Sequence, residues 1–322
     1  MAFTTRIYAN TLAKYNEGKL LSTEKLRRLA DADFESAVKM LCDYGYGDSR
    51  LNENSYDVDK LIAAETARLI DFVANDCPDK DTVSVLLAKF YYNNAKARYK
   101  FRIGGSESVG ALYDIDGDYT VGIASGNYSE CPEPMAQALS ELDAAAALGK
   151  VTPAGIDAAL GKAMFADMHA HARRSGRAVA KYVSAKIDFV NLTSALRALR
   201  LKRGAEAVAE MFIVGGTLSL DDLTAAYSAG LEGFADKLRD TEYYDVLKKF
   251  CDRGFEALPL FESDALETEL SFFDGDLENM VSFAPFLHYY AATLNEFKTV
   301  KIILTCLKNN VREEINRRVR WA

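Results

Sequence analysis

The side chains best suited to metal or acid–base chemistry are two histidines in the segment DMHAHARRSGR. His169 and His171 are two residues apart, which places them about 200° apart on a helix and so on different faces. Only Asp167 and His171 share a face, and the nearby sequence offers no third ligand, whereas protein metal sites use three or four. We therefore interpret this segment as exposed helix surface. His288 lies alone in an aromatic run, which predicts a packed or capping side chain.

Carboxylates at alternate positions of residues 114–118, in the sequence DIDGD, have the spacing of a calcium-binding loop. The pattern then fails, because the glycine comes too early and Ser125 stands where a bidentate glutamate is needed. Short acidic segments with a glycine are also typical of turns. We interpret this segment as an acidic turn.

A second acidic group is similar in composition to the magnesium-binding clusters of all-α synthases that act on diphosphate substrates. It consists of Asp274, Asp276 and Glu278, and Asp221 and Asp222 form a smaller pair. Neither has a full DDxxD spacing. Because acidic residues at helix starts are stabilised by the helix dipole, we favour a structural interpretation.

Other motifs point away from catalysis. The pairs Gly104–Gly105 and Gly215–Gly216 are not followed by GK[ST] and do not belong to a GxGxxG pattern, so they predict turns rather than phosphate-binding loops. No GxSxG or HExxH motif and no Cys/His nucleophile pattern stands out. We therefore predict no catalytic, cofactor-binding or metal-binding residue.

Composition excludes further classes of function. The 322 residues carry a net charge of −8, which repels nucleic acid rather than binding it. The five cysteines are scattered and form no CxxC pair, which indicates reduced thiols in a cytoplasm rather than a disulfide framework. No apolar run reaches the roughly 18–20 residues needed to span a bilayer, so we expect any membrane association to be indirect.

The elements that position these side chains are predicted to be helices. Ser22 precedes a run of apolar residues at three- and four-residue steps, which indicates a capped helix that is broken near Asp31. A helical hairpin continues beyond Pro78. Residues 103–134 are rich in Gly, Ser, Asp and Tyr, which favours loops or a short hairpin. We also expect residues 286–320 to form one helix about 50 Å long.

Internal similarity indicates a repeated unit. Residues 21–46 match residues 218–243 without a gap, with eight identities. The identical pairs are Leu21 and Leu218, Ser22 and Ser219, Leu26 and Leu223, Ala32 and Ala229, Glu35 and Glu232, Leu41 and Leu238, Asp43 and Asp240, and Tyr46 and Tyr243. Segment 88–94 also matches 185–191, and residues 182–199 match 290–307. These matches predict three copies of one helical unit.

Polar residues on the predicted long helices are the remaining candidates for a functional site. They could line a funnel between the helices, although a buried polar residue also fixes the register between helices. The candidates are Lys89, Asn94, Lys186, Asp188, Asn191 and Glu296.

The order and spacing of these segments resemble one family. The stretches YANTLAKYNEGKLLSTEKLRRL, YVSAKIDFVNLTSALRALR, FIVGGTLSLDDL and YYAATLNEFKTVKIILTCLKNNVREEINRRVR are similar to the V-type ATPase and ATP synthase family of the C-type subunit, which is the d-type subunit of eukaryotes. The sequence departs from the repeat pattern in residues 103–134 and at Thr299, which replaces the asparagine present in the other two copies.

The resemblance implies an all-α fold with three helical lobes arranged as a funnel, with residues 103–134 as an irregular or hairpin insertion. We expect the lobes to comprise residues 1–102, 103–203 and 204–322. The family implies a non-catalytic rotor subunit of the central stalk, peripheral at the cytoplasmic face of the membrane. Its expected partners are the axle subunits of the D and F type and the membrane rotor ring.

Two other functions remain open at this point. The repeats alone equally permit a generic helical-repeat scaffold that binds another protein. A magnesium-dependent all-α enzyme that uses Asp274, Asp276 and Glu278 is the third possibility.

Overall fold

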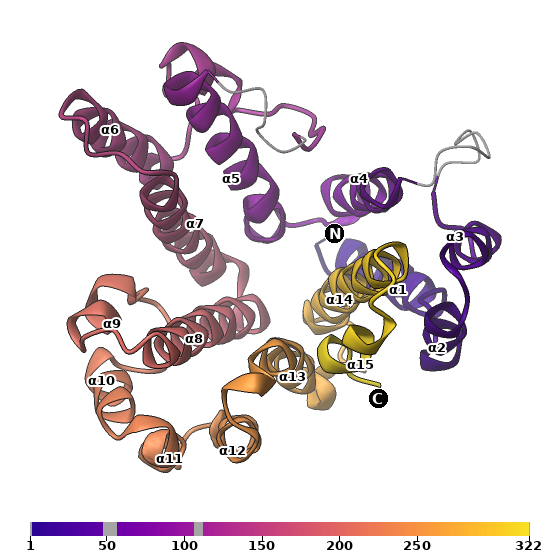
Figure 1. The fold of residues 1–322 in the computed structure, drawn as a ribbon. Coiled ribbons are helices and arrows are strands. Elements are labelled where there is room, and N and C mark those ends of the chain that lie inside the picture. Colours follow the sequence, from indigo (N-terminus) through magenta and orange to yellow (C-terminus); the bar gives the residue numbers. More distant parts are fainter. Residues whose placement is uncertain (1, 48–56, 106–111, 322) are drawn as a thin grey trace. The chain divides into compact units, whose positions relative to one another are not determined.

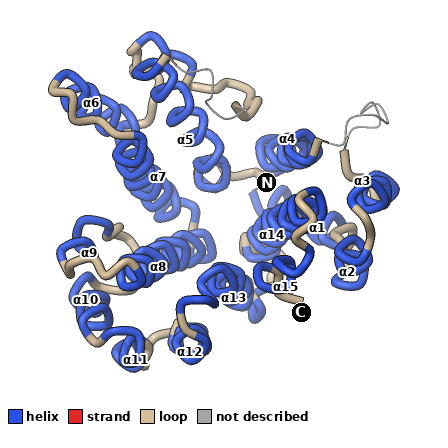
Figure 2. The backbone as a smooth tube through the Cα atoms, in the orientation of Figure 1, coloured by secondary structure: helices blue, strands red, loops and turns tan. Residues whose placement is uncertain are grey.

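The computed structural model describes residues 2–47, 57–105 and 112–321. Within these ranges the chain forms fifteen α-helices and five short 3-10 helices (η1–η5), with no strand (Figures 1 and 2). The predicted all-α fold is confirmed. The chain divides into two compact units, of which unit 1 contains residues 1–69, 189–210 and 218–322, and unit 2 contains residues 70–188 and 211–217. The three-lobed funnel and its borders stay a prediction.

Unit 2 is built around two long antiparallel helices, α5 (Lys80–Gly104) and α7 (Pro153–Ser175). Its other elements are the end of α4 (Val58–Asp76), η1 (Val121–Ser125), α6 (Glu133–Ala147) and the first half of α8 (Arg177–Arg200). Helix α5 packs along α7, and α6 packs on the same helix. Asp79 caps α5 by accepting a 2.8 Å hydrogen bond from Thr82 N–H, and Thr152 caps α7 directly before Pro153.

The insertion in unit 2 corrects one expectation. The described part of residues 103–134 contains loops, turns and η1, so the hairpin that we allowed for is wrong for these residues; residues 106–111 lie outside the described ranges. The predicted acidic turn at residues 114–118 is confirmed, with a turn at residues 116–117.

Unit 1 is organised around the last long helix, α14 (Ala284–Lys308), against which α1, α2, α3, α13, α15 and η5 pack. Its N-terminal part, up to residue 69, contains α1 (Ala2–Glu17), α2 (Thr23–Asp31), α3 (Phe34–Asp43) and most of α4. The second half of α8 also belongs to unit 1. The later elements are α9 (Glu206–Met211, with its last residue in unit 2), α10 (Leu220–Ser228), α11 (Gly230–Phe234), η2 (Asp236–Leu238), α12 (Tyr244–Arg253), η3 (Phe255–Ala257), α13 (Leu258–Ser271), η4 (Asp274–Asp276), η5 (Arg312–Glu314) and α15 (Ile315–Arg318).

Local capping explains where several of these helices begin. Ser22 accepts from Lys25 N–H at 3.3 Å, and its repeat counterpart Ser219 accepts from Asp222 N–H at 3.1 Å. The predicted break near Asp31 is confirmed, because α2 ends at that residue and α3 begins at Phe34.

The single helix expected over residues 286–320 is wrong. Helix α14 ends at Lys308, and Asn310 adopts a left-handed conformation with φ of 56°. Asn310 N–H donates to Leu307 C=O at 3.1 Å and Val311 N–H donates to Cys306 C=O at 2.9 Å, which is the hydrogen-bond pattern of a Schellman motif. Backbone carbonyls that a continuing helix would use are therefore satisfied by a turn.

The ends of the three long helices follow the sequence repeats. Lys80 and Arg177 begin α5 and α8 and are 97 positions apart, as are the left-handed residues Gly105 and Lys202 that follow these helices. Lys202 and Asn310 are 108 positions apart, which is also the spacing of the match between residues 182–199 and 290–307. A left-handed residue therefore follows each long helix at an equivalent position, and α8 and α14 also share the hydrogen-bond pattern of the turn.

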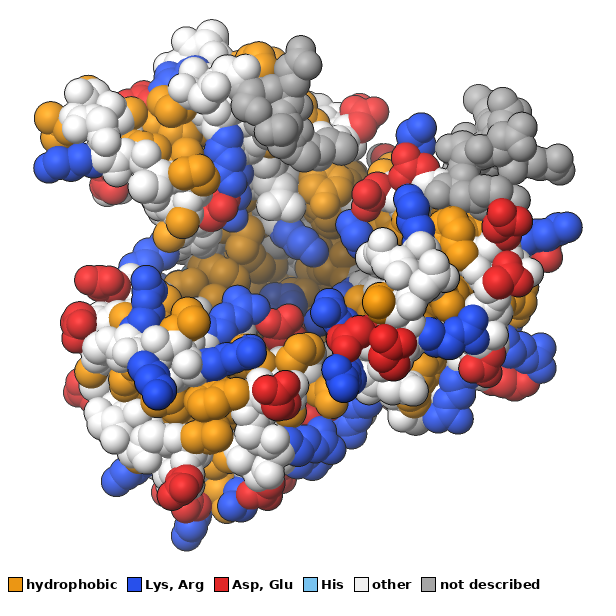
Figure 3. Space-filling model, viewed as in Figure 1, with side chains coloured by type: hydrophobic (Ala, Val, Ile, Leu, Met, Phe, Trp, Pro, Cys, Tyr) orange, Lys and Arg blue, Asp and Glu red, His pale blue; other side chains and the backbone are white. Residues whose placement is uncertain are grey.

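Charges are mixed on the surface. On the face drawn in Figure 3, acidic and basic side chains lie interspersed with hydrophobic ones. Within the described ranges, no helix has both the length and the apolar character that crossing a membrane requires.

Candidate functional site

A buried carboxylate on α14 holds two N-terminal segments of unit 1. Glu296 is 8% exposed and accepts hydrogen bonds from Leu21 N–H and Tyr46 O–H. Burial raises the pKa of Glu296, and the hydrogen bonds from Tyr46 and Leu21 act in the opposite direction. Burial, followed by the nearby Glu296 charge, raises the pKa of Tyr46, so its hydroxyl remains a donor. This side chain therefore joins the start of α2 and the end of α3 to the centre of α14.

A second carboxylate reinforces the same region. Glu65 on α4 accepts from Gly47 N–H at 2.7 Å and from Arg68 at 2.8 Å. Arg68 also donates to the carbonyl of Gly45 at 3.0 Å and to that of Gly47 at 2.6 Å. Burial raises the pKa of Glu65, and the charge of Glu65 in turn adds to the raised pKa of Glu296. The segment that carries Tyr46 is thus held from two helices.

Asp188 plays the equivalent role on α8, within unit 2. Its side chain is fully buried, and its Oδ2 accepts 2.7 Å hydrogen bonds from both the N–H and the hydroxyl of Thr217. A side chain on Gly216 would collide with the Asp188 carboxylate, so the approach of this loop to α8 requires glycine. Leu21 lies one position before the cap residue Ser22, and Thr217 lies two positions before the cap residue Ser219 of the matched segment.

An aromatic contact accompanies the matched segments of unit 1. The Tyr46 and Phe297 rings meet edge to face with centroids 6.3 Å apart, and the Tyr243 and Phe189 rings do so at 5.1 Å. Both tyrosines and both phenylalanines are paired in the sequence repeats. The repeated sequence therefore encodes a repeated joint in which a short helical segment is fastened to the middle of a long helix.

Asn94 fastens the insertion to α5 in unit 2. Its amide is 1% exposed, exchanges two 2.8 Å hydrogen bonds with the backbone of Tyr113, and donates to Asp118 at 3.0 Å. Arg98 also donates to Asp118, at 2.5 Å. Burial acts against ionisation of Asp118, but hydrogen bonds from Thr120, Arg98 and Asn94 outweigh it and lower the pKa of this carboxyl group.

The other sequence candidates lie elsewhere on the long helices. Lys89 is exposed on α5. Lys186 is half-buried, with its ammonium 4.9 Å from the centroid of the Tyr182 ring. Asn191 is buried on α8. The structure thus places Asn94, Asp188 and Glu296 at joints, each in its own surroundings, and does not gather the six candidates into one cluster within either unit.

The histidine segment makes a polar link between α7 and α5. His171 Nε2 is 3.5 Å from Asp167 Oδ1, as the shared helix face predicted, and His171 Nδ1 is 2.6 Å from Asp81 Oδ1. Arg174 donates to the same Asp81 oxygen at 2.9 Å. Burial raises the pKa of Asp167 against the nearby His171 charge, whereas hydrogen bonds from Arg174 and His171 lower the pKa of Asp81. The expectation of plain exposed surface is therefore wrong, since Asp167 is buried and Asp167, His171, Arg174 and Asp81 form a contact between α7 and α5.

The carboxylates considered for magnesium are placed differently. Asp274 and Asp276 lie in η4, and Glu278 forms a 2.8 Å ion pair with Lys14 of α1 while its side chain is 94% exposed. In the part of the chain that the structure describes, no three His, Cys, Asp or Glu side chains are placed to hold one metal ion. His288, expected to be packed or capping, has its Nδ1 3.0 Å from Glu17 Oε1.

Comparison with known proteins identifies the family of this chain. The sequence matches the family described as the ATP synthase (C/AC39) subunit over residues 9–318. The chain belongs to this family. No individual curated protein matches it significantly. The C/AC39 family comprises a subunit of V-type ATPases, and the expected family is thereby confirmed.

In this C/AC39 family member, sequence reasoning missed the residues that complete the joints. Tyr46 and its counterpart Tyr243 were visible as repeated identities, but nothing nearby in the sequence indicated that Tyr46 meets Glu296, 250 positions away. Tyr113 binds Asn94 through its backbone, and Thr217 binds Asp188 through its backbone N–H as well as through a hydroxyl group that many surface residues share. Their roles therefore left no signal in residue type alone.

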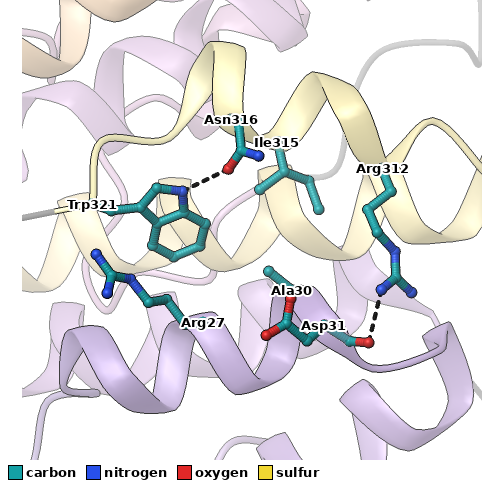
Figure 4. Close-up of a pocket in the computed structure, with 7 residues that line it drawn as sticks. All are labelled: Arg27, Ala30, Asp31, Arg312, Ile315, Asn316 and Trp321. Carbon is teal, nitrogen blue, oxygen red and sulfur yellow. Dashed lines mark hydrogen bonds between the residues drawn. The ribbon is translucent and has the colours of Figure 1, made fainter.

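This family member also has a pocket that the sequence did not predict. It has a volume of about 320 Å³ and lies in unit 1, between α2 and the C-terminal turns (Figure 4). Its lining residues are Arg27, Ala30, Asp31, Arg312, Ile315, Asn316 and Trp321.

Proposed function

We propose that this chain is a non-catalytic coupling subunit in the central stalk of a V-type ATPase. In this role it seats the rotary axle on the membrane rotor ring and transmits torque for proton or sodium transport. Its partners are the axle subunits of the D and F type and the subunits of the ring. It acts as a peripheral protein at the cytoplasmic face of the membrane.

Membership of the C/AC39 family over residues 9–318 is the observation that carries this proposal. The joints of the long helices support it on physical grounds. A protein that transmits torque must be rigid. Close-packed interiors whose polar groups are hydrogen-bonded have low compressibility and transmit strain. Glu296 and Asp188 fasten loops that are distant in sequence to the centres of two long helices, so a load on one segment passes to the helix behind it.

The proposal is tested on the assembled complex. A tag on an axle protein is used to purify the ATPase from native membranes in mild detergent, and the component proteins are quantified by mass spectrometry. We expect the chain to co-purify with both axle and ring in a fixed ratio. Consistent absence from a complex that contains axle and ring would refute the proposal.

A measurement of how tightly ATP hydrolysis is coupled to ion transport distinguishes a rotor component from a scaffold. When the chain is removed and the catalytic head retained, we expect ATP hydrolysis without ion transport, and restored transport when the chain is added back. A scaffold needed only for assembly would instead change the amount of complex and leave the ratio of ions moved to ATP hydrolysed intact in the complexes that form. Asp221→Asn, at an exposed position outside the joints, serves as the matched control variant for joint substitutions.

A further inference from the structure

The pocket between α2 and the C-terminal turns is open to solvent, and specific contacts shape its walls. Arg312 donates to the carbonyls of Asp31 at 2.7 Å and Ala32 at 2.6 Å, which fixes η5 over the end of α2. Trp321 Nε1–H donates to Asn316 Oδ1 at 2.8 Å, which orients the indole ring along one wall (Figure 4). The walls therefore hold a defined shape, with Arg27 and Asp31 both projecting from α2.

Two charged side chains of this pocket, both exposed to solvent, have no polar partner among the described residues. Within the described ranges, no hydrogen bond or ion pair engages the Arg27 guanidinium, which lies 5.8 Å from the centroid of the Trp321 indole. The neighbouring Arg28 is instead paired with Glu24 at 2.5 Å. The Asp31 carboxylate likewise has no polar partner among the described residues, because only its backbone carbonyl is used.

The chemistry of these groups defines a ligand. A guanidinium offers a fork of donors that matches phosphate, and an indole face stacks on flat rings. An unpaired carboxylate accepts from hydroxyl or amine groups and disfavours an anion that lacks them. Arg27, Arg312 and Asp31 leave the lining with a net positive charge, so an anionic ligand with its own donors complements it.

We propose that this pocket binds a small phosphorylated ligand with a flat ring, of the chemical class of a nucleoside monophosphate. Its phosphate lies on Arg27, its ring lies against Trp321, and a hydroxyl or amine group donates to Asp31. The volume of about 320 Å³ suits a ligand of this size, since small-molecule sites begin at about 300 Å³. The site lies within unit 1, and this proposal does not rest on the coupling role.

The chain contains a single tryptophan, so its fluorescence reports on this pocket directly. Full-length protein is titrated with adenosine monophosphate and excited at the red edge of the indole band, where neither tyrosine nor adenine absorbs. We expect a saturable change in Trp321 emission. Adenosine, which lacks the phosphate, and inorganic phosphate, which lacks the ring, are each expected to bind about tenfold more weakly or worse.

Substitutions assign the interaction. Arg27→Gln is expected to weaken binding of adenosine monophosphate about tenfold, because a charge-assisted hydrogen bond is lost, whereas the control Arg28→Gln leaves it unchanged. Trp321→Leu, followed by equilibrium dialysis, is expected to weaken binding by about tenfold through loss of stacking. Unchanged melting temperatures show that the variants fold.

Several outcomes would overturn the proposal. They are no saturable change in emission and no retention in dialysis, equal affinity for adenosine and adenosine monophosphate, or equal affinity of the Arg27→Gln and wild-type proteins. Stronger binding of inorganic phosphate than of the nucleotide would also overturn it, because Asp31 and Trp321 would then play no part.

Discussion

Replacing Glu296 with alanine should weaken unit 1 substantially, whereas glutamine should preserve it. The alanine variant leaves Leu21 N–H and Tyr46 O–H buried without an acceptor, at about 1.5 kcal/mol each. Loss of buried methylene contacts adds about 1 kcal/mol, and about 1 kcal/mol is regained because no charge is buried. The free energy of unfolding should therefore fall by about 3 kcal/mol.

Glutamine keeps a hydrogen bond with each partner, and the cost of the Tyr46 hydroxyl proton that loses its acceptor is largely offset because no charge is buried. Its amide oxygen accepts from Leu21 N–H, and its amide N–H donates to the Tyr46 hydroxyl oxygen. We expect Glu296→Gln to remain within about 1 kcal/mol of the wild-type protein at neutral pH. Urea unfolding followed by Trp321 emission measures this directly, because the only tryptophan lies in the same compact unit as Glu296.

The pH dependence gives a further check on Glu296. Because its pKa is raised on folding, the folded state retains a proton that the unfolded state loses as pH rises above 4.5, the ordinary value for this group. The wild-type protein should therefore lose stability relative to the glutamine variant between pH 4.5 and the raised pKa, and gain nothing below this window.

The reasoning is refuted if the alanine variant loses less than about 1 kcal/mol, or if glutamine is as harmful as alanine.

Two smaller predictions concern unit 2. Asp188→Ala should lower the free energy of unfolding by about 2–4 kcal/mol, because the Thr217 N–H and O–H lose their shared acceptor, and Asp188→Asn should lower it less. Hydrogen exchange at the Thr217 amide measures this loss. Unchanged protection of that amide in the alanine variant would contradict the prediction. Asp81→Asn should cost less than about 1 kcal/mol at pH 7, because solvent screens its contacts with Arg174 and His171. Since the pKa of Asp81 is lowered on folding, this loss of stability should be present above pH 3.8 and should vanish as the pH falls through the lowered pKa. Thermal melts at a series of pH values measure it. A loss of stability that persists in strong acid would contradict the role of the ion pairs.

The sequence by itself determined the local structure of this protein. A cap such as Ser22 and a break such as that at Asp31 depend on groups within four residues, so residue type and spacing were sufficient. Self-similarity also revealed the repeated segments, because each copy keeps the same core pattern. Residue type was not sufficient over residues 286–320. The helix ends there at a left-handed turn at Asn310, and asparagine also occurs inside helices, so no clear stop signal was present in the sequence.

Tertiary structure alone decided what each polar candidate does. Glu296 and Leu21 are 275 positions apart, and their contact exists only because α2 and α14 pack together. Asn94, Asp188 and Glu296 were recognisable as polar residues on apolar helices, but the packing of segments distant in sequence decided which groups they bind. Backbone N–H groups carry no residue signature, so the joints they complete become visible only when distant segments are brought into contact.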